Sequence, residues 1–481
     1  MARFFTAILT IAIPLVLARA LAMEEYGTYK QLFLLSQTLT YILPLGVAQA
    51  LYYYLPRTEE QRPYLGQTII FLTGMGAIAA LILFQGADAI GQWFNNPELV
   101  QYRAPLAVYV FGMVGSFSLE IGITGRGKTR QSALVYLVCD TTRAVAMVAP
   151  ILLGLGLHGA MNAMAAFALA RYAANWVVFY KTSHGPLWNT RLFVSQFIYA
   201  LPFGAAMALA ISQQYAHQFA VSSSVTPELF ALYAVACFQL PIVDLLYTPT
   251  SEVLMVRLGE LEKEGRTHEG AAAFREAGAK LSVVFFPMVA FLFAAAPEFI
   301  GALFGQKFLG AVDMFRVGIL TVALAIFPMD GVLRGRGETR WIFNSYLVKA
   351  LVTLPLVYFG VKHLGMMGGM VSYALAELVG KAMLLIRIPR ALSTVEKKVG
   401  LRELIPWKDL GKASLAAAVA GVSVVVLRWA VPRGMVHLPD DFFWRVIPLG
   451  VSGLLFVAGY VVALRMTGIR LESVLQSFRG R

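Results

Sequence analysis

Long apolar runs that follow one another along the whole chain constrain its fold more than any other feature of the sequence. Each run is long enough for an α-helix to cross the hydrocarbon core of a bilayer, which takes about 20 residues. Hydrophobic residues make up 58% of the 481 residues and charged residues only 14%, whereas soluble domains average about 25% charged residues. The sequence therefore predicts an all-α integral membrane protein.

The ends of these runs are marked by charged residues and by clusters of Gly, Pro and Asn, and they define fourteen expected spans. The expected spans are 4–22, 33–55, 65–87, 104–123, 132–154, 159–180, 193–221, 228–250, 281–299, 314–333, 341–361, 366–386, 413–432 and 446–464. The first run resembles a signal peptide that ends in Ala20-Leu21-Ala22. Because Arg19 directly precedes the supposed cleavage site, we expect this segment to be retained.

The net charge of +13 is distributed unevenly among the loops. When the even-numbered loops and both termini are assigned to one side, that side carries 27 Lys and Arg residues and the other side nine, with four inside spans. Cytoplasmic loops carry an excess of Lys and Arg, so we expect both termini in the cytoplasm. No polar stretch is long enough to form a soluble basic domain, so the charge does not indicate nucleic-acid binding.

An internal repeat divides the chain into two similar parts. The sequence Gly-Arg-Gly-x-Thr-Arg occurs at Gly125–Arg130 and again 210 residues later at Gly335–Arg340, and an acid, Glu120 or Asp330, precedes each copy. Two parallel repeats of six spans are expected to form two lobes with a substrate site between them near the bilayer midplane. The predicted domains are an N-terminal lobe at 1–191, a C-terminal lobe at 192–390, a cytoplasmic interfacial linker at 391–412, and two extra helices with a tail at 413–481.

The first copy of the repeat also fits a nucleotide-binding motif, because Gly122 to Thr129 satisfy the pattern G-x-x-x-x-G-K-[ST]. A P-loop joins a β-strand to a helix, whereas this segment joins two apolar runs and has Glu338 in place of the lysine in the second copy. We therefore expect a tight basic turn and no ATP hydrolysis. The six histidines are scattered, and Cys139 and Cys237 lie inside apolar runs, so no metal site and no other cofactor is expected.

Four cations lie inside the expected spans, where insertion scales assign a charge a cost of roughly 2.5–3.5 kcal/mol. Arg143 has Asp140 three residues before it, and Lys381 has Glu377 four residues before it. Ion pairs at these spacings form on one helix face. These two cations are therefore candidates for a direct contact with a substrate, with a local ion pair as the alternative.

Arg171 and Lys349 have no acid at these spacings, and both lie near the middle of a span. We therefore expect them to line a substrate cavity. Arg19 also has no local acid, but it lies near the outer end of the first span and can extend to the interface. It is a further candidate for the cavity.

The span 193–221 carries a dense group of polar side chains, which hydrocarbon disfavours unless they face protein or water. They are expected to line a cavity that binds sugar hydroxyls or, alternatively, to form hydrogen bonds with a neighbouring helix, and a histidine among them titrates near neutral pH. The candidates are Gln213, Gln214, Tyr215, His217 and Gln218. Asp244 in the next span is the candidate for a coupling ion, H⁺ or Na⁺, with an ion pair to a neighbouring helix as the alternative.

Several segments near the start of the chain resemble one family. Leu17–Leu21, Glu24–Tyr29, Leu45–Ala50 and Tyr54–Arg57, together with the repeated turns and the plan of six, six and two spans, resemble polysaccharide-biosynthesis flippases of the multidrug/oligosaccharidyl-lipid/polysaccharide exporter superfamily. The resemblance implies two lobes that flip a polyprenyl-diphosphate-linked oligosaccharide across the bacterial cytoplasmic membrane by alternating access. It also implies contact with membrane lipids and with the glycan-assembly machinery. In that family cavity cations bind the diphosphate, and Arg19 lies in the matching segment. The candidates that this resemblance implies for the diphosphate are Arg19, Arg171, Lys349, Arg143 and Lys381.

Two other functions were weighed against this one. A multidrug exporter of the same superfamily usually has twelve spans and exchanges cations for Na⁺ or H⁺, whereas the excess of cations and the two extra spans here favour an anionic cargo. A membrane-embedded glycan polymerase or glycosyltransferase is expected to have a large periplasmic loop or a soluble domain, and no loop of this sequence is long enough. Flipping requires no covalent chemistry, so the expected protein is not an enzyme.

Overall fold

A computed structural model of the protein describes residues 2–182, 185–393, 398–430 and 442–468. These residues form helices and connecting turns with no strand among them, which confirms the all-α class. The chain forms two compact units, Met1–Ala234 and Val235–Arg481, and each is described by itself. The predicted boundary between the two lobes, at residues 191 and 192, divides the chain by its sequence repeat and not by compactness, and it stays a prediction. Residues 394–397 of the predicted linker and the predicted tail beyond residue 468 lie outside the described residues.

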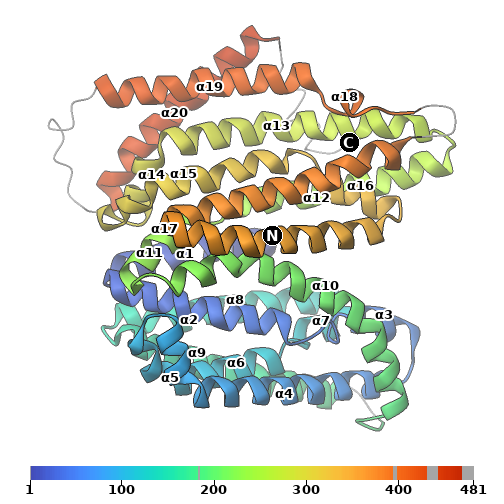
Figure 1. Ribbon diagram of the computed structural model, residues 1–481. Coiled ribbons are helices and arrows are strands. Elements are labelled where there is room, and N and C mark those ends of the chain that lie inside the picture. Colours follow the sequence, from blue (N-terminus) through green and yellow to red (C-terminus); the bar gives the residue numbers. More distant parts are fainter. Residues whose placement is uncertain (1, 183–184, 394–397, 431–441, 469–481) are drawn as a thin grey trace. The chain divides into compact units, whose positions relative to one another are not determined.

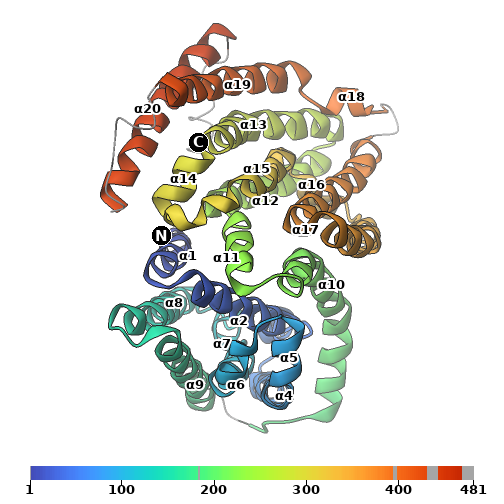
Figure 2. The ribbon, with the colours of Figure 1, turned by 60° about the vertical axis from the view of Figure 1, so that its left-hand side comes forward.

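The first unit is built around α6, which packs against α2, α4 and α9, while α8 packs against α9 and α1 (Figures 1 and 2). The helices of this unit are α1 (Ala2–Ala20), α2 (Met23–Ile42), α3 (Leu51–Tyr54), η1 (Leu55–Arg57), α4 (Gln61–Gln85), α5 (Ala87–Trp93), η2 (Pro97–Tyr102), α6 (Arg103–Gly115), α7 (Leu119–Gly125), α8 (Thr129–Leu152), α9 (Gly156–Thr182) and α10 (Thr190–Ser222), followed by α11 (Pro227–Ala236).

The second unit is built around α13, which packs against α12, α15 and α19, while α19 also packs against α20. The helices of this unit are α12 (Pro241–Lys263), η3 (Thr267–Glu269), α13 (Gly270–Ala294), α14 (Ala296–Leu303), η4 (Gln306–Ala311), α15 (Val312–Leu320), η5 (Thr321–Ile326), α16 (Met329–Gly335), α17 (Thr339–Leu392), α18 (Leu401–Leu404), α19 (Trp407–Ala430) and α20 (Phe442–Met466). Phe274 and Phe285 of α13 anchor an apolar core that also buries Val399 and Leu404 of the predicted linker.

The predicted repeat is present in the structure. Helices α7 and α16 begin and end 210 residues apart, and α8 and α17 begin 210 residues apart. In the turns between them, Gly127 and Gly337 have φ angles of +76° and +70°, a region that glycine adopts without steric cost. The segment Gly122–Thr129 thus runs from α7 through a turn into α8, and because a helix precedes the turn, it is not a P-loop.

Helix α17 consists of two helices joined at Gly365, which has φ +57° and ψ −139°. The two halves correspond to two predicted spans and lie side by side, since a Cβ on Gly368 would overlap the carbonyl group of Gly360. In the first unit the same place in the repeat is occupied by α8 and α9, which are joined through Gly154 and Gly156, also with positive φ. A left-handed glycine therefore reverses the chain at the same point of both repeats.

Several predicted spans are not continuous helices, and the longest break lies in the span 33–55, where residues 43–50 separate α2 from α3. Within this segment Leu45 and Gly46 have φ angles of +46° and +77°. The turn packs closely on α10, where a Cβ on Gly46 would lie 2.7 Å from the carbonyl oxygen of Ala200. Apolarity alone predicts a span through this region and cannot show the turn inside it.

In the part of the chain that the structure describes, nine helices are long and apolar enough to cross a membrane, or ten if α11 and α12, bent by 42°, form one span. One of the nine, α17, holds two predicted spans. The predicted spans 4–22, 33–55 and 159–180 correspond to α1, α2 and α9, which lie outside this set. The structure therefore supports a multi-pass membrane protein, while fourteen spans and cytoplasmic termini stay predictions.

Small residues allow α6 and α9 to approach closely. A Cβ on Gly112 of α6 would lie 2.6 Å from the backbone carbonyl of Ala168 on α9. Helices in membranes commonly pack through small residues in this way, because dispersion contacts rather than water exclusion hold them together. One turn further along each helix, this contact brings Ser116 close to Arg171.

We expect Gly112→Ala to lower the free energy of unfolding by about 1–3 kcal/mol, the usual cost of overpacking, because the new methyl group would meet the backbone of α9. Thermal unfolding in detergent measures the change. Gly74→Ala in α4 is the matched control, since a Cβ there has no atom within 4 Å. Equal melting temperatures for the two variants would contradict the close approach of α6 and α9.

Candidate functional site

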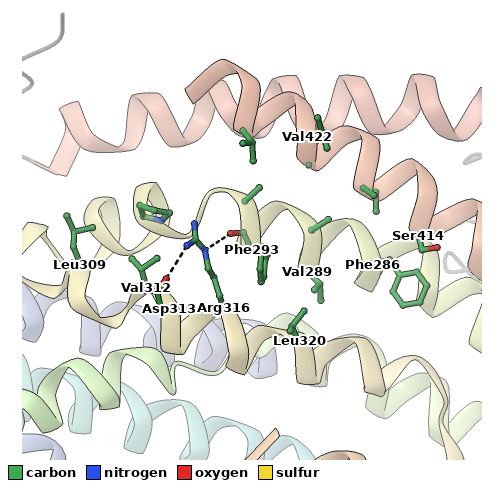
Figure 3. A pocket seen from close by; sticks show the side chains of 17 residues that line it. Phe286, Val289, Phe293, Leu309, Val312, Asp313, Arg316, Leu320, Ser414 and Val422 are labelled. Carbon is green, nitrogen blue, oxygen red and sulfur yellow. Dashed lines mark hydrogen bonds and ion pairs between the residues drawn. The ribbon is translucent and has the colours of Figure 1, made fainter. Parts of the chain in front are cut away.

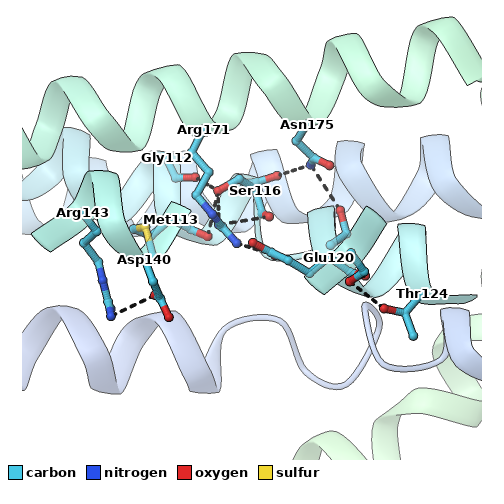
Figure 4. Close-up of polar contacts among 12 residues, drawn as sticks. Gly112, Met113, Ser116, Glu120, Thr124, Asp140, Arg143, Arg171 and Asn175 are labelled. Atoms are coloured by element: carbon cyan, nitrogen blue, oxygen red, sulfur yellow. Dashed lines mark hydrogen bonds and ion pairs between the residues drawn. The ribbon is translucent and has the colours of Figure 1, made fainter. Parts of the chain in front are cut away.

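The main polar cluster of the first unit joins α9 to the break between α6 and α7 (Figure 4). Nη2 of Arg171 donates to Oε2 of Glu120 at 2.6 Å, and Nη1 donates to Oγ of Ser116 at 2.5 Å. The side chains of the ion pair are only 10% and 16% exposed. The Arg171 guanidinium is therefore neutralised and held in place inside the unit.

The same cluster satisfies backbone groups at the helix break. A helix end leaves carbonyl groups without intrahelical partners, and an unsatisfied group in hydrocarbon costs several kcal/mol. Arg171 donates to the carbonyl oxygen of Ser116 at 3.2 Å, and Nδ2 of Asn175, one turn further along α9, donates to that of Gly115 at 3.2 Å. Side chains of α9 thus stabilise the end of α6.

The expectation that Arg171 has no acidic partner is wrong. Glu120 lies 51 residues earlier in the chain on another helix, so a search for acids three or four residues away cannot find it. Arg143 does pair with Asp140 on its own helix, at 3.1 Å, as the spacing predicts (Figure 4). Whether Arg171 and Arg143 also contact a diphosphate stays a prediction.

The cations of the second unit are paired differently from the sequence-based expectation. Nζ of Lys349 lies 2.5 Å from Oε1 of Glu377, across the two halves of α17. The premise that Lys349 has no acidic partner is therefore wrong, and Glu377 pairs with it rather than with Lys381. Nζ of Lys381 lies 5.1 Å from the ring centroid of Tyr247, and within the described ranges it forms no salt bridge.

Matching positions of the two repeats carry the same charges but pair them differently. Arg171 and Lys381 are 210 residues apart, as are the acids Glu120 and Asp330. In the first unit the acid pairs with Arg171, whereas in the second unit Asp330 pairs with Arg334 and accepts a hydrogen bond from the Tyr247 hydroxyl. The shared offset of 210 is the signal in the sequence that could have identified Glu120 and Asp330 as site residues.

The polar residues of α10 differ in burial. Gln213 and His217 are 5% and 3% exposed, and Nδ1 of His217 lies 2.6 Å from the hydroxyl oxygen of Tyr233 on α11. This contact favours the alternative of a helix–helix hydrogen bond for His217. The partly exposed candidates for contact with a glycan are Gln214, Tyr215 and Gln218.

Asp244 lies in the first turn of α12, directly after the bent connection from α11. Its side chain is exposed and forms no salt bridge within the described ranges, so the alternative of an ion pair is not seen there. The negative charge of Asp244 is favourable in a first helical turn.

Arg19 lies in the last turn of α1, where a cation is likewise favourable, and it is partly exposed. The roles of both residues stay predictions.

An apolar groove of about 1140 Å³ lies in the second unit between α13, α15 and α19 (Figure 3). Its walls include Phe286 and Phe293 of α13 and Val422 of α19. Arg316 is the cation of the groove and is paired with Asp313 at 3.2 Å, and it also donates to the carbonyl oxygen of Phe293. The lining thus favours an apolar chain along most of the groove, with a neutralised ion pair at one place.

Comparisons with known proteins give a family and a fold. A family model described as "Polysaccharide biosynthesis protein" matches residues 16–313, while no curated protein matches the chain. A structure of the lipid II flippase MurJ in an inward closed conformation is 14% identical, with a TM-score of 0.72 over 96% of this chain and 98% of that one. At such identities the likeness concerns the fold alone.

Transporters of the MOP superfamily also share the fold. An inward-facing multidrug resistance MATE family transporter is 15% identical, with a TM-score of 0.62 over 81% of this chain and 94% of that one. A MOP superfamily transporter from Pyrococcus furiosus is 16% identical, with a TM-score of 0.53 over 81% and 96%. At these identities the matches show a shared fold, while the family follows from the family model over residues 16–313.

Proposed function

Because the chain belongs to the polysaccharide biosynthesis protein family, we propose that it flips a polyprenyl-diphosphate-linked oligosaccharide from the cytoplasmic to the outer leaflet of the bacterial cytoplasmic membrane. The observation that carries this proposal is the likeness to a lipid II flippase over 96% of the chain. The likeness to the MATE transporter covers 81%, and the larger coverage by the flippase fold supports a flippase over a multidrug exporter.

The proposed substrate has an apolar and an anionic part, and the second unit offers a place for each. A diphosphate carries about two negative charges, and moving it unprotected through hydrocarbon would cost tens of kcal/mol. Lys381 is the preferred cation for it, because Arg171, Arg143 and Lys349 already pair with carboxylates. The groove between α13 and α19 suits part of the polyprenyl chain, because its lining is mainly apolar.

The remaining parts of the proposal concern the glycan and the driving force. Partly exposed polar side chains of α10, among them Gln214 and Gln218, would bind sugar hydroxyls. Asp244, exposed and without a salt bridge in the described part of the chain, would bind the coupling ion, H⁺ or Na⁺. The protein would act with the enzymes that assemble the glycan and would itself catalyse no covalent step.

Reconstitution into liposomes with a fluorescent polyprenyl-diphosphate sugar tests the proposal. We expect the wild-type protein to make the fluorophore accessible to a quencher on the opposite side. Absence of translocation, together with export of an organic cation driven by a Na⁺ or H⁺ gradient, would contradict it and favour the multidrug exporter.

A groove variant tests the place of the lipid chain. Ala418→Phe puts a ring into the groove, and because overpacking costs about 1–3 kcal/mol, we expect flipping to slow roughly fivefold or more. The matched control is Val419→Phe, one residue further along α19, where the side chain is 54% exposed and does not line the groove. Equal rates for both variants would place the lipid chain elsewhere.

A further inference from the structure

Four tyrosine rings gather in the first unit where α3 meets α4 and α10. Tyr53 stacks on Tyr199 with ring centroids 4.6 Å apart, and Tyr54 stacks on Tyr64 at 4.8 Å. The two stacked pairs meet edge to face, since the ring of Tyr54 lies 5.1 Å from that of Tyr53 and 5.6 Å from that of Tyr199. We call these four residues the tyrosine platform.

The tyrosine platform has a buried and an exposed layer. Tyr64 is 8% exposed and belongs to an apolar core, and the hydroxyl of Tyr54 donates to the carbonyl oxygen of Ser195 at 3.2 Å. Tyr53 and Tyr199 are 40% and 48% exposed. Aromatic side chains lose few rotamers when they are fixed, so the buried layer holds the exposed rings in place at little cost.

Arg57 adds a positive charge to the exposed layer. Its guanidinium carbon lies 4.1 Å from the ring centroid of Tyr53, and its Nη1 donates to the carbonyl oxygen of Tyr53 at 2.8 Å. Arg57 forms no salt bridge with any residue that the structure describes, so the remaining donors of the guanidinium are available. The loop charges assign Arg57 to the side on which the substrate would be assembled.

A belt of tyrosines at the membrane interface is the simplest other explanation. Such a belt requires only single exposed rings. Tyr180 is a ring of this kind: it is 66% exposed, and Arg62 lies 5.5 Å from its ring centroid. Tyr180 has no stacked ring partner among the described residues. The tyrosine platform differs from it by two stacked pairs and by a guanidinium that a backbone hydrogen bond fixes.

We propose that the tyrosine platform and Arg57 form a recognition site for the glycosyl phosphate part of the substrate. The exposed ring of Tyr199 presents a flat apolar face, against which the C–H groups of a pyranose ring can pack. The Arg57 guanidinium binds phosphate oxygens in a bidentate manner. This inference rests on the proposed function, because it names the part of the same substrate that is recognised first.

Binding of soluble headgroup fragments to the purified full-length protein tests this site by calorimetry. The probes are glucose 1-phosphate, glucose, and glycerol 1-phosphate, which has the phosphate of a phospholipid but no pyranose. We expect glucose 1-phosphate to bind about tenfold more tightly than the other two. Tyr199→Ala should reduce the affinity for glucose 1-phosphate to that for glycerol 1-phosphate, whereas Tyr199→Phe should keep the wild-type affinity. Arg57→Gln should abolish binding of both phosphates. The matched control is Tyr180→Ala, which should leave all affinities unchanged.

Three outcomes would overturn the site. The first is equal affinity of the wild type for the two phosphates, which would indicate a site for phospholipid headgroups. The second is an unchanged affinity for glucose 1-phosphate in Tyr199→Ala and Arg57→Gln. The third is that the wild type binds none of the probes. Thermal unfolding of each variant separates loss of binding from loss of fold. Failure of this inference and failure of the proposed function are distinguishable: flipping without binding at the platform overturns only this inference, whereas binding without flipping overturns the proposed function.

Discussion

Arg171→Gln is expected to lower the free energy of unfolding by about 3–5 kcal/mol, the range found when one partner of a buried ion pair is removed. The variant leaves the carboxylate of Glu120, only 16% exposed, without its counter-charge. It also removes the donor that the carbonyl group of Ser116 uses at the helix break. Chemical denaturation of the purified protein in detergent measures the loss.

Two further variants separate this structural role from a role in binding substrate. The double variant Glu120→Gln and Arg171→Gln should recover most of the stability, because no buried charge is left unpaired. Arg143→Gln, whose side chain is 28% exposed and pairs on its own helix, should cost clearly less than Arg171→Gln. Wild-type stability of Arg171→Gln with loss of flipping would instead make Arg171 a substrate ligand.

The helices and the repeat were accessible from the sequence because both depend on local properties. Apolar runs identify membrane helices through the cost of exposing polar groups to lipid, and the glycines at positions 127 and 337 mark turns that need a positive φ. The breaks inside helices were not accessible. Residues 43–50 and the end of α6 at Gly115 lie within apolar runs, where only tertiary contacts decide that the helix stops.

The candidate site was predictable only where a charge and its partner lie on one helix. The spacing of Asp140 and Arg143 predicts an ion pair that the structure contains. The partner of Arg171 comes from another helix, and hydropathy and spacing do not reveal such contacts. The repeat supplies the missing information in part, because it places an acid and a cation at matching positions of both halves.

Lys381→Ala is expected to slow flipping by about ten- to a hundredfold while the protein stays folded. A hydrogen bond to a charged group contributes about 1.5–3 kcal/mol, and an alanine cannot provide one to a diphosphate. The free energy of unfolding should fall by no more than about 2 kcal/mol, because Lys381 contacts the ring of Tyr247, and a desolvated cation–π contact is worth about that much. The liposome assay measures flipping, and thermal unfolding measures stability.

Lys349→Ala provides the contrast within the same helix pair. It leaves Glu377 without its partner, so we expect a clear loss of stability, whereas Lys381→Ala keeps that ion pair intact. Lys381→Arg retains the positive charge and should flip substrate at a rate close to that of the wild type. If Lys381→Ala flipped normally, or unfolded as readily as Lys349→Ala, the diphosphate would have to be bound by other cations. Because the Asp330 carboxylate already pairs with Arg334, removal of Lys381 does not leave that carboxylate without a partner. A loss of flipping can then be assigned to a lost contact with the substrate.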